Sequence, residues 1–377
     1  MDITDINGVF CAGIKEKYGL GIVRCKGIVA GVFTRNKIKS ASVLVCEEHI
    51  KDGRIEGLIV NSGNANAFTG ERGIRDAREM CKILANLIKC DEKSIAIAST
   101  GIIGRFLDME WIRRKIPEVY SKLGKSKKHA NDFANAITTT DKFPKKAYTK
   151  NPKISAVAKG AGMICPNMAT MLCFIFTEAK FDQGELYEML KNAVDLSFNR
   201  LIVDGDTSTN DTVLLISTCR ERVKREDFQE ALNNVCIKIA KQIARDGEGA
   251  TKLMEVYVKG ARSKDDALKI ARAIASSLLV KTAIFGNDPN WGRIVAAIGY
   301  SGADVDENIS IEIEGLETVK LVDKGRPLGN EAKAREILKK SNEVRIRVDL
   351  HKGNYEEYVF GCDLSYEYVK INSEYTT

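Results

Sequence analysis

A chain of 377 residues, of which 44% are hydrophobic and 29% charged, is long enough to bury a large core and has the composition of a globular protein. The net charge of +7 is modest, and the most basic run, residues 122–128, contains no aromatic residue, so we interpret it as a solvated surface rather than a nucleic-acid site. The acidic N-terminus lacks an apolar signal segment and no window approaches 18 uncharged apolar residues, so we expect neither a secretory signal nor a membrane-spanning helix.

Short apolar runs separated by glycine predict strands in the N-terminal third, at residues 20–23, 28–33, 42–45, 58–60 and 95–98. Periodic apolar positions predict helices at residues 71–88, 110–123 and 130–137. Strands are expected next at residues 154–157 and 170–176, on either side of a glycine-rich turn.

In the second half of the chain, Asp182 and Glu185 have the spacing of a capping box and predict the start of a helix. A buried strand is expected at 212–217, and amphipathic helices at 225–245 and 265–278. Residues 309–313 and 344–348 alternate apolar and polar side chains, which indicates antiparallel strands with one face in water. This order predicts an α+β fold, an α/β/β/α-type sandwich with mixed sheets, and a smaller α/β lobe at about residues 230–350.

The cysteine and histidine content limits the catalytic and metal-binding chemistry that this chain can use. The ten cysteines are scattered without a C-x-x-C pair, which predicts a reduced, cytoplasmic protein. Histidine occurs only at positions 49, 129 and 351, which argues against a Ser-His-Asp triad or a zinc site. The glycines around residue 160 do not complete a dinucleotide-binding fingerprint, and residues 204–210 lack the glycine and glutamate of an EF-hand. We therefore expect no metal and no bound cofactor, and we interpret 204–210 as a structured polar loop or part of an active-site wall.

Residues 159–176 join a glycine-rich turn to an apolar strand in which Thr170 carries the one hydroxyl group. Thr170 is either an ordinary strand-edge threonine, since threonine is common in strands, or a nucleophile. With histidine scarce, a nucleophilic threonine needs another base. The α-amine of an N-terminal threonine is one, because its reference pKa of ~7.7–8.0 suits base catalysis at neutral pH. That chemistry requires cleavage of the Ala169–Thr170 bond.

From end to end, the chain closely resembles the ornithine acetyltransferase family, the glutamate N-acetyltransferases of arginine biosynthesis. The resemblance rests on several ordered motifs, which are Ser99-Thr100-Gly101, Thr139-Thr140-Asp141, Lys159-Gly-Ala-Gly-Met-Ile, Pro166-Asn-Met-Ala-Thr170, Asp246-Gly-Glu248-Gly, Gly286-Asn-Asp-Pro-Asn-Trp-Gly-Arg293 and Ile371-Asn372-Ser-Glu-Tyr-Thr-Thr377. Supporting matches begin at Val60 and at Ser197, the second of which runs to Asp211.

This resemblance implies a precursor that cuts itself between Ala169 and Thr170. Residues 1–169 and 170–377 would become α and β subunits that share one sandwich core and assemble as a heterotetramer of two α and two β chains. The new N-terminal amine would activate the Thr170 hydroxyl, which would take acetyl from N-acetylornithine and pass it to glutamate in a ping-pong scheme. Acetyl-coenzyme A is a further candidate donor.

The resemblance also assigns roles to individual residues. Thr100 and Gly101 match the oxyanion-hole positions, where a hydroxyl and a backbone N–H stabilise developing negative charge. Substrate-binding positions are matched by Thr139, Lys159, Thr170, Glu248, Asn372 and Thr377. Lys159 would pair with a substrate carboxylate and Glu248 would hold an ammonium group. The last residues are therefore expected to fold back to the site.

Two other functions remain open from the sequence. A related self-processing aminopeptidase or amidase would use water in place of glutamate as the acceptor. A non-enzymatic binding protein would stay uncut at Ala169–Thr170. The binding set of Lys159, Glu248 and Asn372–Thr377 favours the transferase, because a hydrolase need not hold two amino acids in turn.

Overall fold

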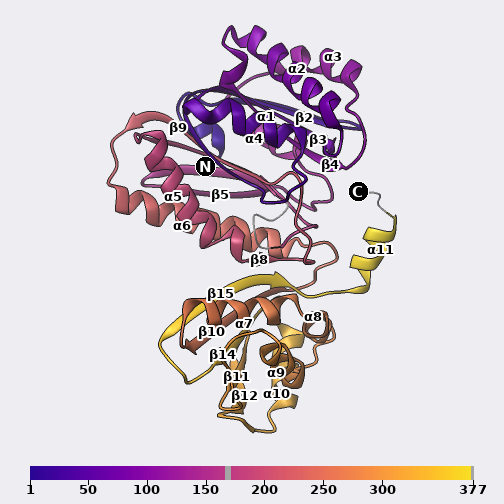
Figure 1. Cartoon of the computed structure of the whole chain (residues 1–377), viewed down its shortest axis with the longest axis vertical. Helices are drawn as coiled ribbons and strands as arrows, with labels where there is room; N and C mark the ends of the chain where they lie inside the picture. The colour runs from indigo at the N-terminus through magenta and orange to yellow at the C-terminus, as the bar shows by residue number, and fades with distance from the viewer. Residues whose placement is uncertain (166–170, 375–377) are drawn as a thin grey trace. The chain divides into compact units, whose positions relative to one another are not determined.

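The computed structural model describes residues 1–165 and 171–374, which Figure 1 shows as a ribbon. The chain divides into two compact units. Among the described residues, the first contains Met1–Asn199 and Asp206–Ile239, and the second contains Arg200–Gly205 and the chain from Ala240 to Glu374. Each unit is built around its own mixed β-sheet, so the predicted α+β class with mixed sheets is confirmed. Within the described residues, no helix is both long enough and apolar enough to cross a bilayer.

Over the described residues, the sheet of the first unit has eight strands in the order β4-β3-β2-β9-β7-β6-β5, with β1 also paired to β2. The strands are β1 (Phe10–Lys15), β2 (Gly19–Phe33), β3 (Arg54–Asn64), β4 (Ile95–Ile102), β5 (Lys145–Lys150), β6 (Lys153–Lys159), β7 (Leu172–Ala179) and β9 (Thr212–Glu221). β3–β4 and β7–β9 are parallel pairs and the other pairs are antiparallel. The two runs predicted at 20–23 and 28–33 form one strand, β2, whose pairing with β3 shifts register between Arg24 and Gly27.

Helices lie between these strands along the chain. They are α1 (Ala41–His49), α2 (Gly70–Ile88), α3 (Met109–Ser121), α4 (Lys127–Ala136), α5 (Gln183–Asp195) and α6 (Arg225–Arg245), the last crossing the division between the units. Buried residues of α1, α2, α3 and α4 belong to the apolar core of the sheet, and α5 packs against β2. Short 3-10 turns lie at Ile3–Asp5, Ile50–Asp52, Glu92–Ser94 and Phe198–Arg200. The capping box predicted at Asp182 and Glu185 is present at the start of α5.

The strand predicted at residues 42–45 is wrong, because this segment lies in helix α1. Ser40 caps the helix by accepting a hydrogen bond from the Val43 N–H at 3.2 Å. Most of the following side chains are buried, so the run shows no amphipathic periodicity. A short, fully buried apolar run has the same sequence pattern in a strand and in a helix. The capping residue Ser40 is the local feature that favours the helix here.

The strands on either side of the glycine-rich turn belong to the same sheet. β6 ends at Lys159, which pairs with Leu172 at the start of β7. Every residue of β7 is buried, and Phe174 and Phe176 lie in the core. The predicted strand at 170–176 thus begins at Leu172 in the described structure. Ala169 and Thr170 lie outside the described residues.

The second unit has a seven-stranded sheet in the order β13-β12-β11-β14-β10-β15-β8. Its strands are β8 (Leu201–Ile202), β10 (Leu253–Ala261), β11 (Ser310–Glu314), β12 (Thr318–Asp323), β13 (Arg326–Pro327), β14 (Glu343–Asp349) and β15 (Tyr355–Cys362). Its helices are α7 (Lys264–Ser276), α8 (Leu278–Phe285), α9 (Trp291–Gly299), α10 (Glu331–Lys340) and α11 (Tyr366–Glu374). One apolar core joins this sheet to helices of the unit.

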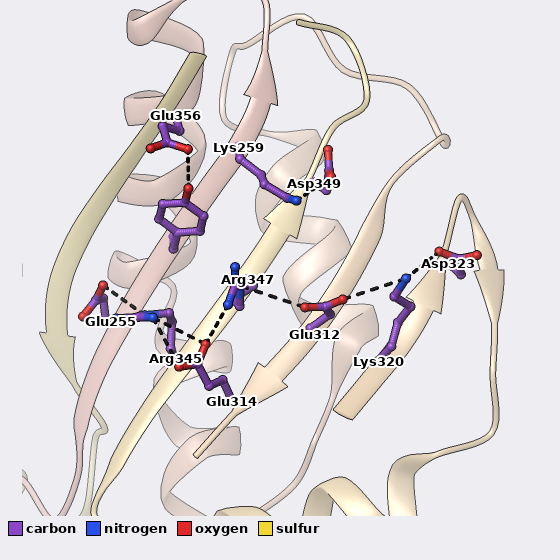
Figure 2. Close-up of polar contacts among 11 residues, drawn as sticks. Glu255, Lys259, Glu312, Glu314, Lys320, Asp323, Arg345, Arg347, Asp349 and Glu356 are labelled. Atoms are coloured by element: carbon purple, nitrogen blue, oxygen red, sulfur yellow. Dashed lines mark hydrogen bonds and ion pairs between the residues drawn. The ribbon is translucent and has the colours of Figure 1, made fainter. Parts of the chain in front are cut away.

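The other face of this sheet carries a network of charged side chains (Figure 2). Arg345 donates to Glu255 at 3.0 Å and to Glu314 at 3.2 Å, and Arg347 donates to Glu314 at 3.0 Å. Val344 and Ile346, which alternate with these arginines along β14, are buried. The predicted alternation of a wet and an apolar face is therefore confirmed in β14.

Candidate active site

Thr100 and Gly101 lie at the end of β4, opposite a register shift at Gly63 and Asn64 of β3. Gly101 has φ +132°, and a Cβ atom there would lie 2.3 Å from the carbonyl carbon of Gly63 and 2.4 Å from the nitrogen of Asn64. Only glycine fits such a backbone, because both the positive φ and the neighbouring main chain exclude a side chain. Bulges of this kind change the direction of a strand and of its side chains, and they are common beside active sites.

Lys159, the last residue of β6, is buried beside this strand end. Its Nζ donates a hydrogen bond to Thr100 Oγ1 at 3.2 Å, across a sequence separation of 59 residues. A lysine ammonium group can only donate, so the Thr100 hydroxyl accepts here and keeps its own proton for another acceptor. The structure thus brings together two of the residues that the sequence predicted for the site.

Asp141 connects the Thr139 segment to the turn that follows Lys159. Its side chain is fully buried, and its Oδ1 accepts from the Gly160 N–H at 2.7 Å and from Lys145 Nζ at 2.5 Å. Its Oδ2 accepts from the Thr139 N–H at 3.0 Å. Burial by itself raises the pKa of Asp141, but the charges of Lys159 and Lys145 outweigh it and lower that pKa to about 2. Asp141 is therefore an anion that holds Thr139 and the glycine-rich turn together.

Lys15 is a third cation near this carboxylate, and sequence reasoning missed it. Its Nζ donates to Ser62 Oγ at 2.8 Å and to the carbonyl of Thr138. Burial and the charge of Lys159 lower the pKa of Lys15, while Asp141 raises it. The charges of Lys15 and Lys159 therefore act on each other at this end of the sheet, and the Asp141 carboxylate opposes the effect of Lys159 on the pKa of Lys15. No motif marks Lys15, because its neighbours Glu16 and Lys17 make the segment look like an ordinary charged turn.

The end of the polar loop predicted at 204–210 lies against the strand that carries Thr100. Asn210 Nδ2 donates to the carbonyl of Ala65 at 2.6 Å and to the carbonyl of Ser99 at 2.8 Å. The next residue, Asp211, accepts the N–H of Met171 on Oδ1 at 3.0 Å. Met171 directly follows Thr170 in the sequence, so this loop contacts both β4 and the residue that comes after the expected nucleophile.

In the second unit, Asn372 of α11 donates to Glu248 Oε2 at 2.9 Å. Gly249, with φ +70°, lies so close to α11 that a Cβ atom there would be 2.3 Å from the nitrogen of Tyr368. Ser365 Oγ also donates to the carbonyl of Gly249 at 2.5 Å. The C-terminal segment thus contacts the Glu248 loop from Ser365 to Asn372, whereas Thr377 lies outside the described residues.

The predicted site residues therefore fall into two groups. Thr100, Gly101, Thr139 and Lys159 are connected within the first unit by the contacts above. Glu248 and Asn372 contact each other within the second unit. Sequence reasoning gave no role to Asp141 or Asp211, although each is the last residue of a motif that carries the resemblance. A carboxylate at the end of a run of hydroxyl or amide residues is a signal that could have found them.

Comparison with known proteins identifies relatives over the whole chain. The profile of the ArgJ family matches residues 7–377. The arginine biosynthesis bifunctional protein ArgJ of Archaeoglobus fulgidus is 66% identical over 100% of both chains, and a glutamate N-acetyltransferase of Methanosarcina mazei is 47% identical over 100% of this chain and 98% of its own. A crystal structure of ArgJ from Bacillus halodurans, with 44% identity and a TM-score of 0.51, covers 54% of this chain and 98% of the solved chain. The chain therefore belongs to the ArgJ family, a family of acetyltransferases.

Proposed function

We propose that this protein is a glutamate N-acetyltransferase of arginine biosynthesis, which transfers acetyl from N2-acetyl-L-ornithine to L-glutamate through an acetyl-threonine intermediate. The names of its Archaeoglobus and Methanosarcina relatives support the reaction. The observation that carries the proposal is the buried contact between Lys159 and Thr100, which puts a substrate-binding cation beside an oxyanion donor at the strand end of the site.

The nucleophile is produced by self-cleavage. Thr170 Oγ attacks the carbonyl carbon of Ala169, its proton leaves to solvent, and the C–N bond breaks as the Thr170 nitrogen gains a proton. Water then hydrolyses the resulting ester, which frees the Ala169 carboxylate and the Thr170 hydroxyl. The solved Bacillus chain supports this step. It is matched over 98% of its own length but covers only 54% of this chain, which is close to the share of this chain that residues 170–377 represent. The solved chain thus has about the length of the expected second fragment.

Acetyl transfer then uses the new amine as the base. The Thr170 amine takes the hydroxyl proton while Oγ attacks the acetyl carbonyl of acetylornithine, and ornithine leaves with the proton that the base returns. The amine of glutamate attacks the acetyl-threonine in the same way and leaves as acetylglutamate. The Thr100 hydroxyl and the Gly101 N–H stabilise the oxyanion in both halves of the reaction.

Charged groups select the substrates. Lys159, with Lys15 close by, favours the carboxylate that ornithine and glutamate share, and Thr139 is held beside them by Asp141. Glu248, oriented by Asn372, pairs with an ammonium group, and Thr377 completes the binding set. These hydroxyl, amine and ammonium groups carry the reaction without a bound cofactor. The two fragments remain together as α and β subunits and pair into a heterotetramer.

The test is to express the protein as parent, as Thr170→Ala and as Thr149→Ala, a matched threonine on β5 outside the site. Mass spectrometry should find two fragments, the second beginning at Thr170, in the parent and in Thr149→Ala. Thr170→Ala should stay intact and transfer no acetyl group to glutamate. A Thr170→Ala protein that splits at the same bond contradicts the proposal. Glutamate acetylation with acetyl-coenzyme A as sole donor measures whether this chain has a second activity, as the name of its bifunctional Archaeoglobus relative suggests.

A further inference from the structure

One buried carboxyl group joins the two segments that carry Thr139 and Lys159. Thr139 lies between α4 and β5, where residues 137–144 belong to neither a helix nor a strand. Lys159 ends β6, and the glycine-rich turn begins at Gly160. Asp141 accepts the Gly160 N–H on Oδ1 at 2.7 Å and the Thr139 N–H on Oδ2 at 3.0 Å. The two segments are therefore tied together by this one side chain.

These two hydrogen bonds constrain the main chain at both proposed binding residues. The Gly160 N–H belongs to the peptide group that starts at the Cα atom of Lys159, and the Thr139 N–H belongs to the peptide group that ends at the Cα atom of Thr139. A peptide group is planar, so a contact with its N–H helps to fix the plane in which that Cα atom lies. The Asp141 carboxyl group thus constrains the separation between the Cα atoms from which the Thr139 hydroxyl and the Lys159 ammonium group extend.

The opposite side of the Thr139 peptide group is held by a cation. The Thr138 carbonyl, which is part of that peptide group, accepts from Lys15 Nζ. Lys15 Nζ also donates to Ser62 Oγ at 2.8 Å, and Ser62 pairs with Thr100 between β3 and β4. A carboxylate and an ammonium group therefore hold this peptide group from its two sides, and the ammonium group also contacts the strand pair that carries Thr100.

Asp141 and Lys145 form an ion pair in which neither side chain is exposed to solvent. Lys145 Nζ, at the start of β5, donates to Asp141 Oδ1 at 2.5 Å. Removing two charges from water is costly, and apolar replacements of such buried pairs are often equally stable, so stability alone does not explain the pair. A carboxylate accepts hydrogen bonds from several directions at once, as this one does from Lys145, Thr139 and Gly160. An apolar side chain could not replace those contacts.

We propose that Asp141 is a positioning residue for acetyl transfer, which holds Thr139 and Lys159 at the separation that the substrate requires, with Lys145 as its buried counter-ion. This inference rests on the function proposed above, in which Thr139 and Lys159 bind the substrate. The Asp141 side chain has no exposed surface, so it acts through these two residues and does not touch the substrate. Its loss should therefore weaken substrate binding more than it slows the chemical step.

The test compares Asp141→Asn with Glu178→Gln. Glu178 is a matched control because it is also a buried carboxylate that accepts a backbone N–H, from Asn7 at 3.1 Å, and pairs with a lysine, Lys153. As at Asp141, these partners lower the pKa of Glu178 against the effect of burial. Glu178 follows Thr177, which pairs with Ile154 at the end of the β6–β7 pair away from Lys159. It therefore lies outside the site.

The expected change is in KM. Asp141→Asn keeps one carbonyl oxygen but replaces the other with an NH2 group, which cannot accept. In the cleaved protein, KM for acetylornithine and for glutamate should rise at least about tenfold, as expected for the loss of a hydrogen bond to a charged group, and kcat should fall by less than about threefold. Glu178→Gln should change both constants by less than about twofold, because distant sites act independently. Parental KM values in Asp141→Asn, with or without a fall in kcat, would overturn the inference.

A mutant cycle separates positioning from general destabilisation. Asp141→Asn is added to a protein that already carries Thr139→Ala and Lys159→Met, and so lacks both side chains that Asp141 is inferred to place. In this background Asp141→Asn should lower kcat/KM by less than about twofold, because residues that act through one another are not additive. The full effect seen in the parent would mean that Asp141 acts elsewhere in the protein, and would overturn the inference.

A third measurement needs no variant of Asp141, in case Asp141→Asn does not fold. Hydrogen exchange at the Thr139 and Gly160 amides of the parent is compared with exchange at the same amides in the urea-unfolded protein. Both amides lie outside helices and strands, so exchange at least about tenfold slower in the folded protein would reflect their bonds to Asp141. An unprotected amide at either position would overturn the inference while the proposed function stands. A parent protein that neither cleaves nor transfers acetyl overturns the proposed function itself.

Discussion

Lys159 donates a hydrogen bond to Thr100 through a contact of 3.2 Å between Nζ and Oγ1, and this contact joins the end of β6 to the end of β4. The ammonium group thereby occupies an acceptor site of the threonine and leaves the hydroxyl proton available. One buried contact thus joins the proposed substrate-binding cation to the proposed oxyanion donor. Four predictions follow from this contact and from the residues around it.

Thr100→Val should lower kcat by ~10²–10³, which is the usual effect of removing one oxyanion-hole donor. Thr100→Ser keeps the hydroxyl and should retain most of the parental turnover. Steady-state transfer assays with acetylornithine and glutamate measure both variants, after mass spectrometry has confirmed cleavage. Equal kcat values for the valine and serine variants would show that the Thr100 hydroxyl is not an oxyanion donor.

Lys159→Met should raise KM by roughly 10- to 100-fold, because a hydrogen bond to a charged group contributes about 1.5–3 kcal/mol. Lys153→Met is the control on the same strand, since the Lys153 side chain is 41% exposed and pairs with Glu178 outside the site. The control should change KM by less than about twofold, as expected for an exposed ion pair. If both variants have parental KM values, Lys159 does not bind the substrate.

Gly101→Ala should destabilise the protein far more than Gly104→Ala. Both glycines have positive φ, at +132° and +78°, but a Cβ atom at Gly101 would overlap backbone atoms, whereas one at Gly104 has nothing within 4 Å. Gly104→Ala should therefore cost only the strain of a left-handed residue, about 1–2 kcal/mol. Thermal unfolding of the two variants gives the comparison, and equal losses would contradict the crowding at Gly101.

Asp141 should stabilise the protein in a pH-dependent way. Its pKa in the folded protein is about 2, below the ordinary value of 3.8 for an aspartate, so the folded state favours the ionised form. The resulting stabilisation, about 2 kcal/mol, is present above the unfolded pKa near 4 and is lost as the pH falls toward 2. Asp141→Asn lacks this carboxylate and also leaves Lys145 without that partner.

Urea unfolding of the parent and of Asp141→Asn, at several pH values from 6 down to 3, checks this prediction. The difference in unfolding free energy between them should shrink as the pH falls, because the parental carboxylate becomes protonated. A difference that stays constant over this range would mean that Asp141 is not held ionised by Lys145 and Lys159.

Local sequence signals predicted much of the fold. The capping box at Asp182 and Glu185 and the alternation along β14 depend on residues that are neighbours in the chain, and both are present in the structure. The segment 42–45 was misassigned because its side chains are buried nearly all round in α1, which removes the periodicity that distinguishes a helix.

The residues of the candidate site also differ in whether a local sequence pattern predicted them. Motifs with a family resemblance pointed to Thr100, Gly101 and Lys159, and the backbone at Gly101 shows why glycine stands there. No local pattern revealed Lys15, whose partners Ser62 and Thr138 are distant in sequence. Its place in the site comes from strand pairing rather than from its neighbours in the chain.

By itself, the sequence determined the family, the main helices and strands, and the residue types available for the chemistry, including the scarcity of histidine. Only the tertiary structure decided which carboxyl groups matter and in which state. Asp141 is ionised among buried cations, whereas Asp211 is driven toward its neutral form by burial beside Met171. The pKa of the same type of side chain shifts in opposite directions because desolvation and pairing are set by long-range packing, which no local pattern encodes.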